Sequence, residues 1–166
     1  MNPRWLALPS LLLLVGCPAL DPAQAYREAA RRLAFSLDRV EPTLRVAFPL
    51  ERSRVGFRLT LGVDNPSDLH LKARSLGGEL LLEQGGQVQR VGNVAFTQGL
   101  DLPARGRASL PVELSFTYEE LKGAWGPLQK VLRSPHGAVW RLEGQAGLDV
   151  LGIPVTVPLR ARKTLD

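Results

Sequence analysis

The alternation of apolar and polar side chains between residues 55 and 64 is the feature that most constrains how this chain can fold. Apolar residues occupy every second position, at Val55, Phe57, Leu59, Leu61 and Val63. Successive side chains of a β-strand point to opposite faces, so this pattern predicts a strand that buries one face. Similar runs, separated by segments rich in glycine and proline, recur between residues 33 and 164. We therefore expect a mostly all-β fold: an antiparallel β-sandwich of about seven strands and of immunoglobulin or fibronectin-like size, with one internal helix and a short N-terminal helix.

Other strands can be placed by the same pattern. Alternation at Leu44, Val46 and Phe48 predicts a strand before the one at 55–64. Segment 69–83 predicts two strand pieces, with a β-bulge or kink at Gly77-Gly78. The remaining expected strands are residues 88–96, 110–116, 138–148 and 153–161.

The connections between these strands carry turn-forming residues. Segment 84–87 predicts a hairpin turn around two glycines, and Leu151-Gly152 predicts a second one near the end of the chain. Segment 98–107 predicts a loop. Pro111 has no N–H to donate to a neighbouring strand, so its strand is expected at the edge of a sheet or to start late.

One internal segment changes from a period of two to a helical period. Apolar residues three to four positions apart predict a helix over residues 118–132. Thr117 and Glu120 have the spacing of a capping box that would open this helix. Gly126-Pro127 lies inside it, so we expect the helix to kink or to split into two short pieces there.

The first 16 residues predict an export signal, and Cys17 follows them directly. The apolar run from Trp5 to Val15 spans about 11 residues, which suits the core of a secretory signal and is too short to cross a bilayer. Its end, Leu14-Val15-Gly16-Cys17, resembles the lipobox of bacterial lipoproteins. That resemblance implies an exported protein of the cell envelope, anchored to a membrane by acyl groups on Cys17 after residues 1–16 are removed. The alternative is an ordinary cleaved signal followed by an incidental cysteine.

The rest of the chain has the size of one domain. Residues 17–32 are expected to form the lipidated cysteine, a tether and a short helix that Asp21 caps, and residues 33–164 to form the sandwich. Cys17 is the only cysteine, so no disulfide can support the core. The formal net charge of +5 favours attraction to anionic headgroups, whereas the chain lacks a run of five basic residues and we expect no nucleic-acid partner.

The chain lacks a residue pattern that points to catalysis. His70 and His136 lie far apart in the sequence, each beside turn-forming residues. The motifs of an activated nucleophile, a phosphate loop and a metal site are all missing from the sequence. We therefore expect no catalytic residues, no metal and no cofactor, and we do not expect an enzyme.

The strand at residues 59–64 runs into Asn65-Pro66-Ser67, and this pattern resembles the strand and Asn-Pro-Asn turn of the late embryogenesis abundant type 2 family, whose module is also called the water stress and hypersensitive response (WHy) domain. The similarity continues in the Pro103-to-Gly106 turn, in the segment from Trp140 to Gly144 and in the last hairpin, and it covers roughly residues 33–162. Ser67 stands where the family usually has a second asparagine, and Trp140 stands where tyrosine is common.

The resemblance implies a small seven-stranded sandwich with one helix and without known catalytic residues, in a family associated with dehydration and other stress. Because Asn65 precedes a proline, it must be extended, and its amide can hold the turn backbone. We therefore interpret Asn65, Pro66 and Ser67 as a structural turn; contact with a ligand is the alternative.

These observations leave three functions open. The first is a non-enzymatic envelope lipoprotein that protects membranes or client proteins under desiccation or other stress. The second is a module that binds or transfers a lipid or another apolar ligand between its sheets, and the third is an interaction partner in envelope assembly. The residues that would contact an apolar ligand, which are otherwise simply core, are Phe57, Leu59, Leu114, Phe116 and Trp140.

Overall fold

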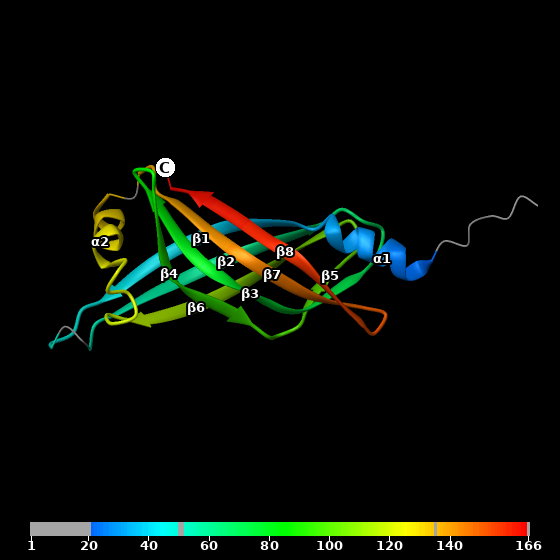
Figure 1. Cartoon of the computed structure of the whole chain (residues 1–166), viewed down its shortest axis with the longest axis horizontal. Helices are drawn as coiled ribbons and strands as arrows, with labels where there is room; N and C mark the ends of the chain where they lie inside the picture. Colours follow the sequence, from blue (N-terminus) through cyan, green and yellow to red (C-terminus); the bar gives the residue numbers. More distant parts are fainter. Residues whose placement is uncertain (1–20, 50–51, 135, 166) are drawn as a thin grey trace, which may run out of the picture.

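The computed structural model describes residues 21–49, 52–134 and 136–165, and their strands form two antiparallel sheets that face each other (Figure 1). The smaller sheet has the order β1-β2-β6, and the larger has the order β4-β3-β7-β8, with the short strand β5 paired to β3. The expected all-β sandwich is confirmed. The strands are β1 Ala34–Arg45, β2 Arg54–Asn65, β3 Leu71–Gln84, β4 Gln87–Phe96, β5 Leu100–Leu102, β6 Gly106–Thr117, β7 Val139–Val150 and β8 Ile153–Thr164.

The core lies between the two sheets and is built from the alternating positions. Val55, Phe57 and Leu59 of β2 face inward, as the pattern predicted, and they meet inward-facing residues of β3 and β7 such as Leu82 and Trp140. All the buried residues of this core belong to the described part of the chain. This core draws on both sheets and on α1 and α2.

The prediction of a strand with alternating core residues at 44–48 is wrong. Strand β1 ends at Arg45. Leu44 near its end, and Val46 and Phe48 after it, have exposed side chains. The strand instead begins at Ala34, where the period-two pattern is hidden. A β-bulge between Leu37 and Arg39 breaks the alternation, so that two core residues stand three positions apart.

The bulge expected at Gly77-Gly78 is also wrong, because β3 runs through both glycines in regular register with β7. The register shifts of β3 lie elsewhere, between Ala73 and Ser75 and between Leu80 and Leu81. A Cβ atom on Gly78 would collide with the backbone of β7, and one on Gly144 of β7 would collide with the backbone at Gly77. The glycines therefore permit a close approach of β3 and β7.

The two predicted hairpin turns are confirmed, and one short strand was not predicted. Gly85 and Gly86 both have positive φ and form the two-residue turn between β3 and β4, and Leu151 and Gly152 do the same between β7 and β8. Pro111 lies on β6, which is an edge strand as expected. The predicted loop at 98–107 contains the additional strand β5, whose three residues were too few to show an alternation.

The N-terminal helix α1, Pro22–Arg31, begins as predicted: Asp21 caps it, with its Oδ1 accepting a hydrogen bond from the Ala23 N–H at 3.0 Å. Ala29 and Ala30 bury its inner face against one end of the sandwich, close to the turn between β7 and β8 (Figure 1). No helix of the described residues is long and apolar enough to cross a membrane.

The internal helix is shorter than predicted. The capping box forms, since Glu120 Oε2 accepts from the Thr117 N–H at 2.7 Å, but residues 118–124 are turns and helix α2 spans only Trp125–Arg133. Pro127 explains the difference, because it lacks the N–H that a continuous helix would need and is tolerated only in a first turn. The expected split into two helical pieces at Gly126-Pro127 is therefore wrong, because a single helix begins just before Pro127 and contains both residues.

We expect the close approach of β3 and β7 to be sensitive to a single added carbon. Gly144→Ala should lower the free energy of unfolding by about 1–3 kcal/mol, because backbone atoms on the facing strand cannot move aside as a flexible side chain would. Urea unfolding measures the change. Gly126→Ala is the matched control, since a Cβ there meets open space, and a similar loss in both variants would contradict this account.

Candidate functional site

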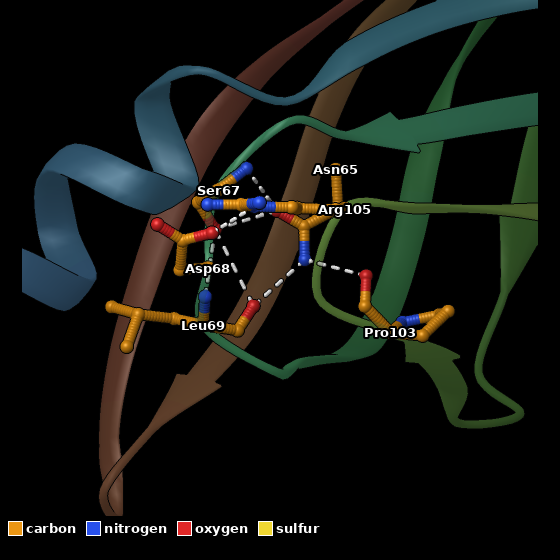
Figure 2. Close-up of polar contacts among 6 residues, drawn as sticks. All are labelled: Asn65, Ser67, Asp68, Leu69, Pro103 and Arg105. Carbon is orange, nitrogen blue, oxygen red and sulfur yellow. Dashed lines mark hydrogen bonds and ion pairs between the residues drawn. The ribbon is translucent and has the colours of Figure 1, made fainter.

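Asn65 is a buried polar residue at the end of β2, with only 1% of its surface exposed. Its Nδ2 donates to the carbonyl oxygens of Leu69 at 2.8 Å, Pro103 at 3.0 Å and Leu102 at 3.2 Å (Figure 2 shows the first two). Two N–H groups therefore serve three acceptors, so at least one hydrogen bond is shared. The carbonyls come from two segments separated by more than 30 residues, and the amide holds both in place.

The side-chain oxygen of Asn65 accepts hydrogen bonds from Ser67, the residue that departs from the family pattern. Asn65 Oδ1 accepts from the Ser67 hydroxyl at 2.7 Å and from the Ser67 N–H at 3.2 Å. A serine can make both contacts, so the missing second asparagine leaves no donor of the turn unused. In the turn predicted at Asn65, Pro66 and Ser67, the side chains of Asn65 and Ser67 bond to each other and to the backbone of their own protein.

Arg105 reinforces the same connection from the opposite segment. Its N–H donates to the Ser67 carbonyl at 2.8 Å, and its guanidinium pairs with the carboxylate of Asp68 (Figure 2). The hydrogen bond from Arg105 holds the pKa of Asp68 below its usual value. We call Asn65, Ser67, Asp68, Leu69, Pro103 and Arg105 the Asn65 cluster.

A second polar network lies nearby on the outer face of the smaller sheet. Arg107 of β6 contacts Asp64 of β2 at 2.8 Å and both carboxylate oxygens of Asp38 at 2.7 Å. Gly62 leaves room for the guanidinium, because a Cβ there would overlap Arg107. The sequence analysis missed this network, since only the pairing of strands far apart in the chain brings its members together. Gly62 inside a strong strand pattern was the one available signal.

The residues predicted to contact an apolar ligand are parts of the packed core. Phe57, Leu59, Phe116 and Trp140 are buried and Leu114 is half-buried. The ring of Phe57 packs edge-on against those of Trp140, at 5.2 Å between centroids, and Phe116, at 5.9 Å. Trp140 Nε1 has no hydrogen-bond partner within the described ranges.

One apolar hollow lies between the sheets, and it is small. It lies beside Leu59, Leu61 and Leu142 and encloses about 10 Å³. That volume holds at most about one water molecule. This hollow has no room for an acyl chain.

Both histidines of the chain lie on the described surface. His70 is exposed, with its Nε2 3.9 Å from a carboxylate oxygen of Asp101, and His136 is exposed as well. Residues 21–49, 52–134 and 136–165 contain no group of three or more His, Cys, Asp and Glu side chains that could hold a metal ion. Cys17, with the signal segment before it, lies outside the described residues.

Comparison with known proteins supports the fold. No protein-family model matches this chain, and no curated protein sequence matches it. Its structure is similar to the solution structure of AT1g01470 from Arabidopsis thaliana, with a TM-score of 0.53 and 16% identity over 79% of each chain. A candidate late embryogenesis abundant protein, At2g46140.1, matches over 86% of this chain and 78% of its own, with a TM-score of 0.47 and 13% identity. A protein from Archaeoglobus fulgidus matches over 79% of this chain and 98% of its own, with a TM-score of 0.40 and 13% identity.

The β-sandwich that the family resemblance implied is confirmed, and AT1g01470 shares this architecture. At these identities the similarity concerns the architecture. Within that architecture, the Asn65 cluster occupies the position where the Asn-Pro pattern was found in the sequence.

We expect Asn65→Ala to lower the free energy of unfolding by about 2–3 kcal/mol, because three carbonyl groups, the one of Leu102 buried and the other two part-buried, lose their donor. Urea unfolding of residues 21–166 measures the loss. Asn93→Ala is the control, because Asn93 bonds only to the exposed Arg90 and should change stability by about 0.5 kcal/mol or less. Equal losses of stability in the two variants would show that the hydrogen bonds of Asn65 do not stabilise the fold more than those of an exposed asparagine.

The Arg107 network predicts a dependence on pH. The hydrogen bond from Arg107 is the largest cause that lowers the pKa of Asp38 below 3.8, its usual value; partial burial opposes it and the Ser36 hydroxyl adds to it. A lowered pKa in the folded state contributes stability above the unfolded pKa, and this contribution is lost as the pH falls through the folded value. Asp38→Asn should therefore be less stable than the wild type by about 0.5–1 kcal/mol at pH 7, since the pair is partly exposed. The difference should shrink as the pH falls from 3.8 through the lowered folded value, and it should also shrink in high salt. A difference that does not depend on pH would contradict this account.

Proposed function

We propose that this protein is a non-enzymatic lipoprotein of the cell envelope, whose WHy-like domain protects membranes or neighbouring proteins during desiccation or other stress. The observation that carries the proposal is the Asn65 cluster within a WHy-like sandwich. The motif that resembles the family is Asn65-Pro66-Ser67, and its polar side chains form hydrogen bonds within the protein. These side chains are therefore engaged in holding the turn, which supports a role without catalysis.

The character of the described surface supports a protective role. The outward faces of β2, β6, β7 and β8 carry charged and hydroxyl side chains, many of them in ion pairs such as Arg58 with Glu113 and Arg141 with Glu143. A hydrated surface of both charge signs suits a protein that must stay soluble and folded while water is withdrawn.

The membrane anchor is the second part of the proposal and depends on Cys17. Three residues separate Cys17 from Asp21, so a fully extended connection would span about 14 Å. Acyl groups on Cys17 would therefore keep the end of the sandwich that carries α1 close to the bilayer. Two or more chains would make that attachment firm where one is marginal.

The lipid-binding alternative has less support. It needs space between the sheets, and the hollow there encloses only about 10 Å³. A ligand would therefore have to force the sheets apart, which would cost packing energy. Native mass spectrometry of the purified domain tests this alternative, because a bound lipid would favour it over a closed sandwich.

The protective function can be tested by drying. A labile enzyme dried with residues 21–166 should retain clearly more activity than the same enzyme dried with an equal mass of albumin. Asn65→Ala should lose the advantage under conditions in which it is unfolded, because the proposal requires the folded sandwich. Protection equal to that by albumin would reject the protective role.

The anchor is tested separately in a bacterial host. The full-length protein should be found in the membrane fraction with the mass of an acylated chain that starts at Cys17. Cys17→Ser should release the protein from the membrane fraction or leave its signal uncleaved. A wild-type chain that is secreted without lipid would reject the anchor and leave the drying result unaffected.

A further inference from the structure

Three apolar side chains are exposed at the end of the sandwich farthest from α1. Leu44 is 41% exposed, Val46 68% and Phe48 93%. They follow one another at alternate positions where β1 ends, and Figure 1 shows the connection between β1 and β2 at the opposite end of the long axis from α1. An exposed phenylalanine beside two further apolar side chains points to an interaction surface, since single exposed apolar residues are common but a group is not.

Arginines surround this apolar group. Arg45 and Arg54 face each other directly across β1 and β2, a like-charge arrangement that is unfavourable in a sheet. Among the described residues, no carboxylate forms an ion pair within 4 Å of Arg45 or Arg54. The next arginine along β2, Arg58, pairs with Glu113 at 3.2 Å and with Glu41 at 3.7 Å.

The two facing arginines border a cleft. It encloses about 530 Å³ on the outer face of the smaller sheet, over the bare backbone of Gly56. Thr43 and Ser115 supply hydroxyl groups to its lining, and Glu113 is the carboxylate at its far side. Glu120, whose pKa is lowered mainly by its hydrogen bonds from Thr117, also feels the charge of Arg54. The cleft thus offers positive charge at the end nearest to Phe48.

We propose that this end of the sandwich docks on an anionic phospholipid bilayer. We define the docking tip as Leu44, Arg45, Val46, Phe48, Arg52 and Arg54. Phe48 and Val46 enter the interface between headgroups and acyl chains, and the arginines bind the headgroup phosphates. Arg52, which is also exposed, adds a third positive charge to the tip.

Charge decides between a bilayer and a second copy of this chain. Symmetric pairing of two docking tips would bring Arg45 and Arg54 of one copy against the same residues of the other, and like charges would repel. An anionic bilayer instead presents negative phosphates above an apolar layer, which matches the arrangement of arginines around apolar side chains. The bilayer is therefore the occupant that fits.

The docking tip is independent of Cys17. The described chain begins at α1, and the tip lies at the other end of strands that are 12 residues long, or about 40 Å. If Cys17 is acylated as well, the molecule has a membrane contact at each end of its long axis.

Vesicle flotation of residues 21–166 tests the proposal, because this part contains both sheets of the sandwich and lacks Cys17. A cooperative urea unfolding transition of the same protein shows first that it is folded. The wild type should float with vesicles that contain about 30% phosphatidylglycerol in phosphatidylcholine, and much less with pure phosphatidylcholine. Arg45→Gln with Arg54→Gln should weaken the binding about 25-fold at low salt, since each arginine near an anionic surface contributes roughly fivefold. Val46→Ser with Phe48→Ser should weaken it about tenfold or more.

Matched controls come from the rest of the described surface. Leu151→Ser with Ile153→Ser changes two exposed apolar residues near α1, and Arg160→Gln with Arg162→Gln changes two exposed arginines of β8. Both controls should bind as the wild type does. Binding lost in the controls and kept in the tip variants would overturn the proposal, as would no flotation at all or a dimer in solution that depends on Phe48.

A gain of signal provides a second readout. The fluorescence of the Phe48→Trp variant should shift to shorter wavelength on anionic vesicles and be quenched by brominated acyl chains, whereas the native Trp125 and Trp140 are half-buried and buried. Vesicle binding without any change in the emission of the introduced indole would place the contact elsewhere and reject the docking tip.

Discussion

The side-chain amide of Asn65 is the contact on which the connection between the two sheets depends. Asn65 ends β2 in the smaller sheet, and its acceptors lie on the way to β3, on β5 of the larger sheet and on the way back to β6. One buried side chain thus joins two of the crossings between the sheets. A buried amide with all its partners in place specifies a single arrangement, whereas any other arrangement would leave several polar groups unpaired.

The rest of the architecture follows from that closure. With the two crossings fixed, the inward faces of β2 and β7 meet in register for packing, and Phe57 can lie between the rings of Trp140 and Phe116. On the outer face, the same strand ends carry the Arg107 network. The Asn65 cluster and the Arg107 network thus lie at one end of the sandwich, whereas Phe57 and Phe116 pack toward the other end, where the docking tip is exposed.

Much of this fold could be predicted from local pattern, and the failures have a physical cause. The alternation from Val55 to Val63 predicted β2 because every second residue faces the core, and Asn65-Pro66 predicted the turn. The bulge after Leu37 hid the start of β1, and the end of the sandwich left Phe48 without a facing sheet. The acceptors of Asn65 at residues 102 and 103, and the partners of Arg107, depend on how distant strands pair, which no local pattern contains.

The measurement that tests the central claim most directly is the behaviour of the Asn65 side-chain amide in solution. In nuclear magnetic resonance spectra of residues 21–166, both Nδ2 protons of Asn65 should exchange slowly with water and show couplings through hydrogen bonds to backbone carbonyls at Leu69 and at Leu102 or Pro103. Asn93, which is exposed, should exchange rapidly in the same sample. An Asn65 amide that exchanges as fast as that of Asn93 would show that it does not hold the two crossings together, and would contradict the account.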